Sequence, residues 1–446
     1  MQRWRIRARL SSSITSPKLK ILYISQYFPP EMGAPAARVS ELARYWVAAG
    51  HDVTVLTGFP NHPTGVLHPE YRSRFRRLVW REQVDGIKVI RTWLIPLPNR
   101  KPHERMLNYS SFCLSASITG TIIGRPDVVI ATSPQLLVGI CGWWVSRIKN
   151  VPLVLEIRDL WPESLAAVGV GNSGSLLHGG LARLAKFLYR ACHHLVVVTP
   201  AFREHIVREW RVPEQKISVV PNGVETGLFS PSAEGDSVRA QLGLQGKFVV
   251  SYIGTLGMAH DLGTVLDTAA KCAESMPSVA FLLAGEGADK ERIISLARER
   301  QLRNVRFLPQ QPRNKVPVLI AASDACLVTL RQSDVFKTVI PTKMLEFMSC
   351  GKPIILAVEG QARELLRSAD AGICIQPQDP VGVVSAIRRL MSDPDLCRRL
   401  ACNGRSYIEQ NLSRFKTSEA YIRVLEPIVE RNSPRLAATI PEATEP

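Results

Sequence analysis

The sequence predicts an α/β protein built from two doubly wound, Rossmann-like domains that face each other across a cleft. Short apolar runs alternate with amphipathic segments in both halves of the chain, the pattern of parallel sheets covered by helices. The length of 446 residues agrees, because one hydrophobic core seldom serves more than about 300 residues. A Pro221-Asn222-Gly223 turn near the middle of the chain predicts the junction between the domains.

The expected organisation follows from this junction. It comprises a disordered basic tail at 1–18, an N-terminal domain at 19–221, a C-terminal domain at 222–412, a last helix at 413–431 and a disordered tail at 432–446. Doubly wound domains bind ligands at the carboxyl ends of their strands, in the crevice between domains. The loops that follow the strands are therefore where the chemistry is expected.

Runs of apolar and β-branched residues predict the strands of the first half. They lie at residues 20–26, 51–57, 87–92, 127–131, 153–157 and 194–199. Helical spacing predicts helices at 38–49, with Gly50 as its C-cap, and at 180–191. The uncharged stretch 107–124 is too rich in serine and threonine for a membrane span, so it predicts a helix that is buried or lies at a lipid surface.

The second half repeats the alternation from its start. Strands are expected at 248–253, 280–284, 305–307, 325–329 and 353–357. Helices are expected at 262–273, 289–300, 315–321, 342–350, 381–391, 395–403 and 415–431.

The positive charge belongs almost entirely to the first half. Residues 1–223 hold 29 Lys and Arg against 14 Asp and Glu, whereas residues 224–446 hold 27 against 25. A basic domain suits nucleic acid, an anionic membrane or a polyanionic small molecule. The near-neutral second half, and the lack of any recognisable nucleic-acid-binding motif, argue against nucleic acid. Nine scattered cysteines without a C-x-x-C pair predict reduced thiols in a cytosolic protein and no zinc site.

The segment 336–353 carries the most informative chemical pattern. Pro341 suits the first turn of a helix. Lys343 and Glu346 are three residues apart and share a face, with Thr342 on the same side. Free N–H groups at a helix start, together with a lysine, attract a phosphate, and a carboxylate one turn further can accept hydrogen bonds from a ribose diol. The alternative is an ordinary exposed Lys–Glu pair.

This segment resembles the donor-nucleotide signature of the family 4 retaining glycosyltransferases, which have the GT-B fold. The family pattern has two glutamates separated by seven residues and ends in G-x-P. Glu346 and Gly351-Lys352-Pro353 match the second glutamate and the ending, whereas Thr338 stands at the first glutamate. The motif Pro341-Thr342-Lys343 is typical of the subgroup that makes bacterial surface polysaccharides, including proposed N-acetyl-L-fucosamine transferases. The resemblance implies that Glu346 binds the ribose, and that Thr338 replaces a residue that contacts the donor sugar.

Further segments extend the resemblance over nearly the whole chain. Residues 219–225 resemble the family's hinge, and residues 252–257, with Gly254 and Thr255, resemble the first strand and loop of its nucleotide-binding domain. The family often has an arginine at Thr255 and a lysine at His260, so here the diphosphate charge falls to Lys343 or Lys337.

Three glycines are expected to let the backbone approach a ligand. Gly285 and Gly287 form a turn after a strand, for which loop geometry alone is the alternative interpretation. Gly33 opens the first helix and permits close approach of donor phosphates or acceptor; the alternative is an ordinary connecting loop. Arg158 and Asp159 follow another strand. Arg158 suits the binding of an anionic group, and Asp159 suits the acceptance of a proton from the acceptor hydroxyl. The alternative is an ion pair between the two residues that braces the loop.

The resemblance implies a hexosyltransferase or N-acetylhexosaminyltransferase whose C-terminal helix returns to the first domain. It implies a nucleotide sugar donor, UDP-linked by default, with an N-acetylated deoxyhexosamine as one candidate sugar. The acceptor is a saccharide on undecaprenyl diphosphate, in bacterial O-antigen, capsule or exopolysaccharide synthesis. Neither an essential metal nor a cofactor is expected. The alternatives are a nucleotide-sugar 2-epimerase of the same fold and a non-catalytic nucleotide-binding protein.

Clustered cations in the first half predict an anionic membrane surface as a partner. They are Arg72, Arg74, Arg76, Arg77, Arg81, Arg100, Lys101 and Arg105. The expected location is cytoplasmic, peripheral on the inner face of the bacterial plasma membrane, and a homo-oligomer is left open.

Overall fold

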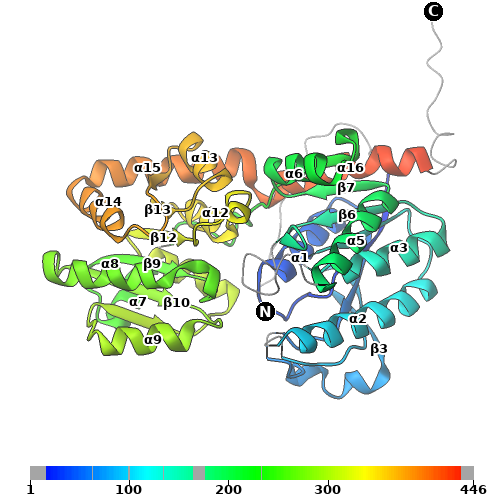
Figure 1. Cartoon of the computed structure of the whole chain (residues 1–446), viewed down its shortest axis with the longest axis horizontal. Helices are drawn as coiled ribbons and strands as arrows, with labels where there is room; N and C mark the ends of the chain where they lie inside the picture. The colour runs from blue at the N-terminus through cyan, green and yellow to red at the C-terminus, as the bar shows by residue number, and fades with distance from the viewer. Residues whose placement is uncertain are drawn as a thin grey trace, which may run out of the picture.

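The computed structural model describes residues 17–62, 64–98, 101–133, 135–163, 176–232 and 234–432. Each half of the chain forms one sheet with helices on both faces, which confirms the predicted fold class (Figure 1). Most of both predicted tails lies outside the described residues, as does Arg100 of the predicted membrane cluster.

The first sheet has eight strands in the order β3-β4-β2-β1-β5-β6-β7-β8, all parallel except β3, which runs antiparallel to β4. The strands are β1 (Lys20–Ile24), β2 (Asp52–Gly58), β3 (Val79–Val84), β4 (Ile87–Thr92), β5 (Val128–Thr132), β6 (Leu153–Ile157), β7 (His194–Val197) and β8 (Ile217–Val219). The prediction missed β3 and β8. Strand β3 is an edge strand with polar side chains on both faces, and β8 has only three residues.

Helices cover both faces of the first sheet. They are α1 (Ala34–Ala48), α2 (Pro102–Ile122), α3 (Leu137–Lys149), α5 (Leu176–Ala191), α6 (Pro200–Trp210) and α16 (Arg414–Asn432). Successive residues of β1 point to opposite faces. Ile21 and Tyr23 join the core under α1 and α16, while Leu22 and Ile24 join the core under α2, α3, α5 and α6.

The uncharged stretch forms most of α2, which begins at Pro102. One side of this helix is buried through Asn108, Phe112 and Ala116. The other side is exposed at Leu114 (65%), Ile118 (57%) and Ile122 (72%). Within the part of the chain that the structure describes, none of the helices has the length and apolar character to cross a bilayer.

The second sheet has six parallel strands in the order β11-β10-β9-β12-β13-β14. They are β9 (Phe248–Ile253), β10 (Val279–Ala284), β11 (Val305–Leu308), β12 (Ala325–Thr329), β13 (Ile354–Ala357) and β14 (Gly372–Cys374). The helices are α7 (Gly235–Leu242), α8 (Leu262–Ser275), α9 (Lys290–Glu299), α10 (Val316–Ala321), α11 (Asp334–Lys337), α12 (Thr342–Ser349), α13 (Gln361–Ser368), α14 (Pro380–Ser392) and α15 (Pro394–Tyr407). The core on one face includes α8, α9 and α14, and the core on the other includes α10, α12 and α13.

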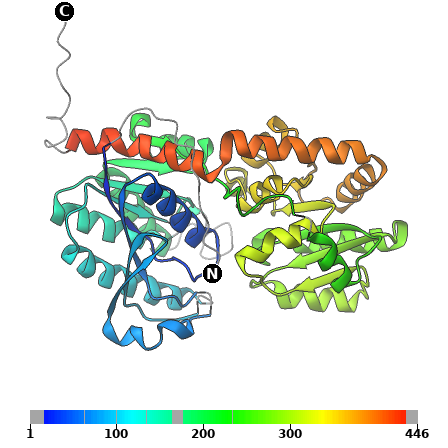
Figure 2. The same ribbon diagram turned by 180° about the vertical axis from the view of Figure 1, so that it is seen from behind.

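The chain crosses between the two halves twice, and the two crossings pair with each other. The Val224 N–H donates to Leu412 O (2.8 Å), and the Arg414 N–H donates to Val224 O (2.7 Å). Beyond this point α16 runs back over the first sheet (Figure 2). There Trp46 Nε1 donates to Ser418 O (3.1 Å), and Tyr421 is fully buried. The C-terminal helix therefore returns to the first half, as predicted.

Candidate functional site

The loop after β9 and the first turn of α12 meet at Lys343. Its Nζ donates to the Tyr252 hydroxyl (2.5 Å) and lies 3.8 Å from the centre of the Tyr252 ring. Gly254 directly follows β9, with φ +144°, and a Cβ built there would lie 3.0 Å from Cε and Nζ of Lys343. A glycine is needed at this position for both its backbone angle and the lysine. The structure thus brings together Gly254 and Lys343, two predicted site residues that are far apart in sequence.

Removal from water lowers the pKa of Lys343 to about 7, and the charge of Glu346 opposes this shift only in part. Burial, followed by the charge of Lys343, also lowers the pKa of His260 to about 3. His260 is therefore neutral near pH 7, and Lys343 is the titrating cation at this end of α12. An anion that binds beside Lys343 would restore its charge.

Glu346 lies one turn further along α12, and an arginine contacts it. Nη1 of Arg313 donates to Glu346 Oε1 (3.0 Å), and Nη2 donates to Glu41 Oε1 (2.7 Å) on α1 of the first half. Burial raises the pKa of Glu346, although Arg313 opposes the shift. Arg414 Nε donates to the other oxygen of Glu41, Oε2 (2.8 Å). Ion pairs therefore link Glu346 to the first half of the molecule.

The glycine turn after β10 packs against the loop after β9. A Cβ on Gly285 would lie 1.8 Å from Gly254 O, and one on Gly287 would lie 2.3 Å from Leu256 O. The close backbone approach that these glycines permit is therefore to the protein's own loop. Gly285 and Gly287 therefore support the loop after β9, which carries Gly254 and packs against Lys343.

The three predicted threonines occupy different parts of the site. Thr342 is the first residue of α12, beside Lys343. The carbonyl of Thr255 accepts a hydrogen bond from the Tyr252 hydroxyl (2.7 Å), so Thr255 helps to hold the ring under Lys343. Thr338 directly follows α11, and its carbonyl accepts a hydrogen bond from Thr199 Oγ1 (2.8 Å) in the first half. Its hydroxyl donates to Val335 O (2.7 Å).

Lys337, the second lysine considered for the diphosphate, has acidic partners of its own. Its Nζ lies 2.8 Å from Asp334 Oδ1 and 3.7 Å from Glu359 Oε2. Lys343 has no such carboxylate within ion-pair distance among the described residues, which favours Lys343 for a phosphate.

The first half contributes the loop between β1 and α1. Gly33 precedes α1 with φ +132°, a value that favours glycine. Earlier in the loop, Glu31 is buried and accepts hydrogen bonds from the N–H groups of Asn61 and His62 (both 3.0 Å). Burial raises the pKa of Glu31 to about 7. Glu31 thus braces the loops after β1 and β2 against each other.

Arg158 and Asp159 follow β6 at the carboxyl edge of the first sheet. Nε and Nη1 of Arg158 are buried and have no hydrogen-bond partner among the described residues. Burial and then the charge of Arg38 lower the pKa of Arg158, so an anion there would be stabilised. Burial raises the pKa of Asp159 to about 6, with Arg158 opposing. No direct hydrogen bond between the two side chains is found, so the bracing ion pair is not seen.

Sequence reasoning missed Arg313, Glu41 and Arg414. Arg313 lies 33 residues from Glu346 and 272 from Glu41, so no local pattern joins them. Glu41 alone left a signal, because it is an acidic residue on a helix face that also carries buried apolar residues. Within the described residues, no group of His, Cys, Asp and Glu is arranged to hold a metal ion.

Comparison with known proteins covers both halves of the chain. Residues 33–223 match the model of the glycosyl transferase 4-like domain, and residues 236–407 match that of the glycosyl transferases group 1. The chain is 25% identical over 421 residues to WcaI of Escherichia coli (strain K12), a glycosyl transferase assigned to colanic acid biosynthesis. The match covers 91% of this chain and 99% of WcaI.

Solved structures share the arrangement of both halves. Anabaena Alr3699/HepE, in complex with UDP and glucose, superposes with a TM-score of 0.68 at 19% identity and covers 91% of this chain and 99% of its own. Sucrose-phosphate synthase from Thermosynechococcus elongatus superposes with a TM-score of 0.70 at 20% identity and covers 93% of this chain and 100% of its own. At these identities the likeness concerns the fold.

Proposed function

This chain belongs to the family 4 glycosyltransferases with the GT-B fold, and we propose that it transfers a sugar from a nucleoside diphosphate sugar to a lipid-linked saccharide. The observation that carries the proposal is Lys343 at the start of α12, packed on Gly254, with Glu346 one turn away. A cation and free helix N–H groups suit the diphosphate, and the carboxylate suits the ribose. WcaI, a relative over nearly the full chain, supports polysaccharide synthesis as the setting.

The proposed donor is UDP-linked, with an N-acetylated deoxyhexosamine as the candidate sugar, and the acceptor is a saccharide on undecaprenyl diphosphate. The bond between the anomeric carbon and the diphosphate oxygen breaks as the acceptor oxygen attacks from the same face. The proton of the acceptor hydroxyl passes to the leaving diphosphate, so the configuration is retained. Lys343 and the start of α12 stabilise the charge that develops on the diphosphate. The proposed diphosphate site is bordered by Thr342, Gly254 and Thr255.

Arg158 and Asp159 serve the acceptor in this proposal. Nε and Nη1 of Arg158, which have no hydrogen-bond partner among the described residues, suit an acceptor phosphate or other anion at the edge of the first sheet. Asp159, whose pKa is about 6, suits a hydrogen bond from the acceptor hydroxyl. Neither an essential metal nor a cofactor is part of this proposal.

The test of the function is a turnover assay with and without acceptor. Purified chain is incubated with a panel of UDP- and GDP-sugars and a synthetic polyprenyl-diphosphate saccharide, and the lipid product is resolved by mass. A lipid that gains one sugar supports the proposal. Donor that is epimerised without acceptor identifies the 2-epimerase alternative instead, and nucleotide binding without any turnover identifies the non-catalytic alternative.

Donor binding is expected to depend on pH through Lys343. Above its pKa of about 7 the free protein carries a neutral amine, so binding of a diphosphate requires proton uptake. The affinity for UDP should therefore fall as the pH rises from 7 to 9, by at most about tenfold per pH unit. Calorimetric titrations in buffers of different ionisation heat should show proton uptake at pH 8. A flat profile in the wild type, equal to that of Lys343→Met, would contradict this assignment.

An exposed face on α2, α3 and α5 supports membrane attachment of the acceptor half. Its apolar residues are Leu114, Ile118, Ile122, Trp144, Ile148 and Phe187. Exposed cations lie among them at Arg147, Arg183, Lys186 and Arg190. Exposed apolar side chains interspersed with cations suit an anionic bilayer, to which each cation contributes about 1 kcal/mol. In the cluster expected from sequence, Arg74 and Arg77 instead lie over the Trp80 ring.

Replacement of both Leu114 and Ile118 by serine is expected to reduce flotation with phosphatidylglycerol vesicles at least severalfold, because two exposed apolar anchors are lost. The matched control is Val381→Ser, an equally exposed apolar residue on the second half (62%). Unchanged flotation of the double variant would contradict the assignment of this face. A monomer–dimer shift without lipid, measured by light scattering, would assign the face to a second copy instead.

A further inference from the structure

A chain of four charged side chains crosses from the second half of the molecule to the first. Arg313 lies in the short 3-10 helix Arg313–Lys315 after β11. It contacts Glu346 on one side and Glu41 on the other, and Glu41 in turn contacts Arg414. We call Glu346, Arg313, Glu41 and Arg414 the interdomain ion-pair chain.

The four residues of the interdomain ion-pair chain differ in their exposure to solvent. Glu41 (3%) and Arg414 (2%) are buried, whereas Arg313 (34%) is partly open to solvent. Burial alone would raise the pKa of Glu41, but Arg414 and Arg313 outweigh it and lower that pKa. Glu41 is thus an ionised carboxylate that binds two arginines at once. Because removal of one partner leaves a buried charge uncompensated, the contacts are coupled rather than independent.

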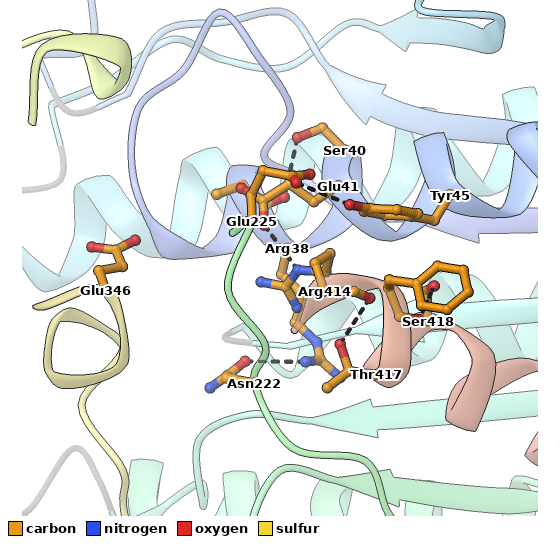
Figure 3. A network of polar contacts seen from close by, with 12 residues as sticks. Arg38, Ser40, Glu41, Tyr45, Asn222, Glu225, Glu346, Arg414, Thr417 and Ser418 are labelled. Atoms are coloured by element: carbon orange, nitrogen blue, oxygen red, sulfur yellow. Dashed lines mark hydrogen bonds and ion pairs between the residues drawn. The ribbon is translucent and has the colours of Figure 1, made fainter. Parts of the chain in front are cut away.

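Glu41 belongs to a face of α1 that holds residues 220–225, the linker by which the chain first crosses between the halves. On the same face, Arg38 donates to the carbonyls of Val220 (3.2 Å) and Pro221 (3.1 Å), and the Tyr45 hydroxyl donates to Glu225 Oε1 (2.9 Å). Figure 3 shows these side chains projecting from α1 toward the linker and the start of α16. A change in the relative orientation of the two halves would therefore alter the contacts of Glu41.

We propose that Arg313 is a positioning residue that makes donor affinity depend on the first domain, because it holds Glu346 on one side and Glu41 on the other. This rests on the proposed function, in which Glu346 accepts the ribose hydroxyls. Arg313 occupies only Oε1 of Glu346, and each carboxylate oxygen has two acceptor sites, so a ribose diol can bind while Arg313 stays in place. An orientation that separates Glu41 from Arg313 loosens Glu346 and lowers donor affinity. By linkage, the donor favours the orientation seen here.

The test is a double-mutant cycle with UDP as the titrant. Arg313→Gln is expected to raise the Kd about tenfold, and Glu41→Gln, which lies in the other domain, about fivefold. The double variant should match Arg313→Gln alone, because in this proposal Glu41 affects donor affinity by holding Arg313. Tyr45→Phe is the matched control: it removes another contact between α1 and the linker without touching Arg313, and it should leave the Kd unchanged.

A pH profile separates positioning from a merely structural role. Arg313, Glu41, Arg414 and Lys343 are the charged groups that act on Glu346 or lie beside it. Without Arg313 the pKa of Glu346 rises further, so its carboxylate protonates at higher pH. The ratio of the variant Kd to the wild-type Kd should therefore grow as the pH falls from 8 to 6.

Several outcomes would overturn the proposal. An unchanged Kd for Glu41→Gln, single-variant effects that multiply in the double variant, or an equal effect of Tyr45→Phe would each do so. If Glu41→Gln does not fold, Glu41→Asp keeps a negative charge near both arginines while its shorter side chain weakens the contact with Arg313, and it carries the same expectation. A wild type that binds no nucleoside diphosphate would overturn the proposed function as well, whereas wild-type binding with indifferent variants would overturn the coupling alone.

Discussion

Replacement of Lys343 by methionine is expected to lower kcat/KM for sugar transfer by roughly 10²- to 10³-fold, the cost of losing one preorganised group that stabilises transition-state charge. Methionine has nearly the length of lysine, so it can still pack on the Tyr252 ring and beside Gly254. The variant should lose catalysis without losing its fold. Steady-state assays at saturating acceptor measure the effect.

Thermal unfolding provides a check on the same variant. The pKa of Lys343 is about 7 in the folded chain against an ordinary value of 10.5, so the unfolded chain binds the extra proton between these values. The stability of the wild type should therefore rise with pH across this window, through this residue, and the penalty for burying the charge is complete below pH 7. Lys343→Met should show less of this rise than the wild type.

Lys337→Met is the control for Lys343→Met. The two lysines lie near the same segment, but Lys337 is paired with Asp334 and Glu359. It should change kcat/KM far less than Lys343→Met does. A wild-type kcat/KM in Lys343→Met, or an equal loss in both variants, would contradict the role assigned to Lys343.

Glu346→Gln is expected to weaken UDP binding by roughly 10- to 100-fold, because hydrogen bonds to a charged acceptor contribute about 1.5–3 kcal/mol. Glutamine keeps the shape of the side chain but removes the charge that Arg313 contacts and that we propose for the ribose hydroxyls. The decisive readout is the preference for UDP over 2′-deoxy-UDP. The wild type should discriminate between them, and the variant should discriminate less.

This preference distinguishes contact from indirect damage. General disturbance of the site by Glu346→Gln would weaken both nucleotides equally and leave their ratio unchanged. An unchanged ratio, or full UDP affinity in the variant, would contradict the proposed ribose contact.

Local pattern predicted the fold well where each element is long or strongly periodic. The strand Phe248–Ile253 has the bounds that were expected, because a run of apolar and β-branched residues ends at a glycine. The strand Val79–Val84 was missed because it is an edge strand whose register is set by pairing with β4, not by its own alternation. Strand β14 has only three residues, Gly372–Cys374, too few to show a period.

In the candidate site too, the residues on one element could be predicted, whereas contacts between distant elements could not. Lys343 and Glu346 could be predicted because their spacing on one helix is written in the sequence. The closeness of Gly254 to Lys343 could not be predicted from local pattern, because it arises only when the loop after β9 packs against the start of α12. Arg313 and Glu41 could not be predicted, because their ion pair depends on how one domain is oriented against the other.

The most direct measurement is a crystal structure of the chain with UDP bound. We expect the diphosphate to lie within hydrogen-bond distance of Lys343 Nζ and of the first N–H groups of α12. We also expect the ribose hydroxyls to donate to Glu346 while Arg313 keeps its contact with Glu41. A nucleotide bound elsewhere on the chain, or bound beside α12 with its ribose away from Glu346, would contradict the account.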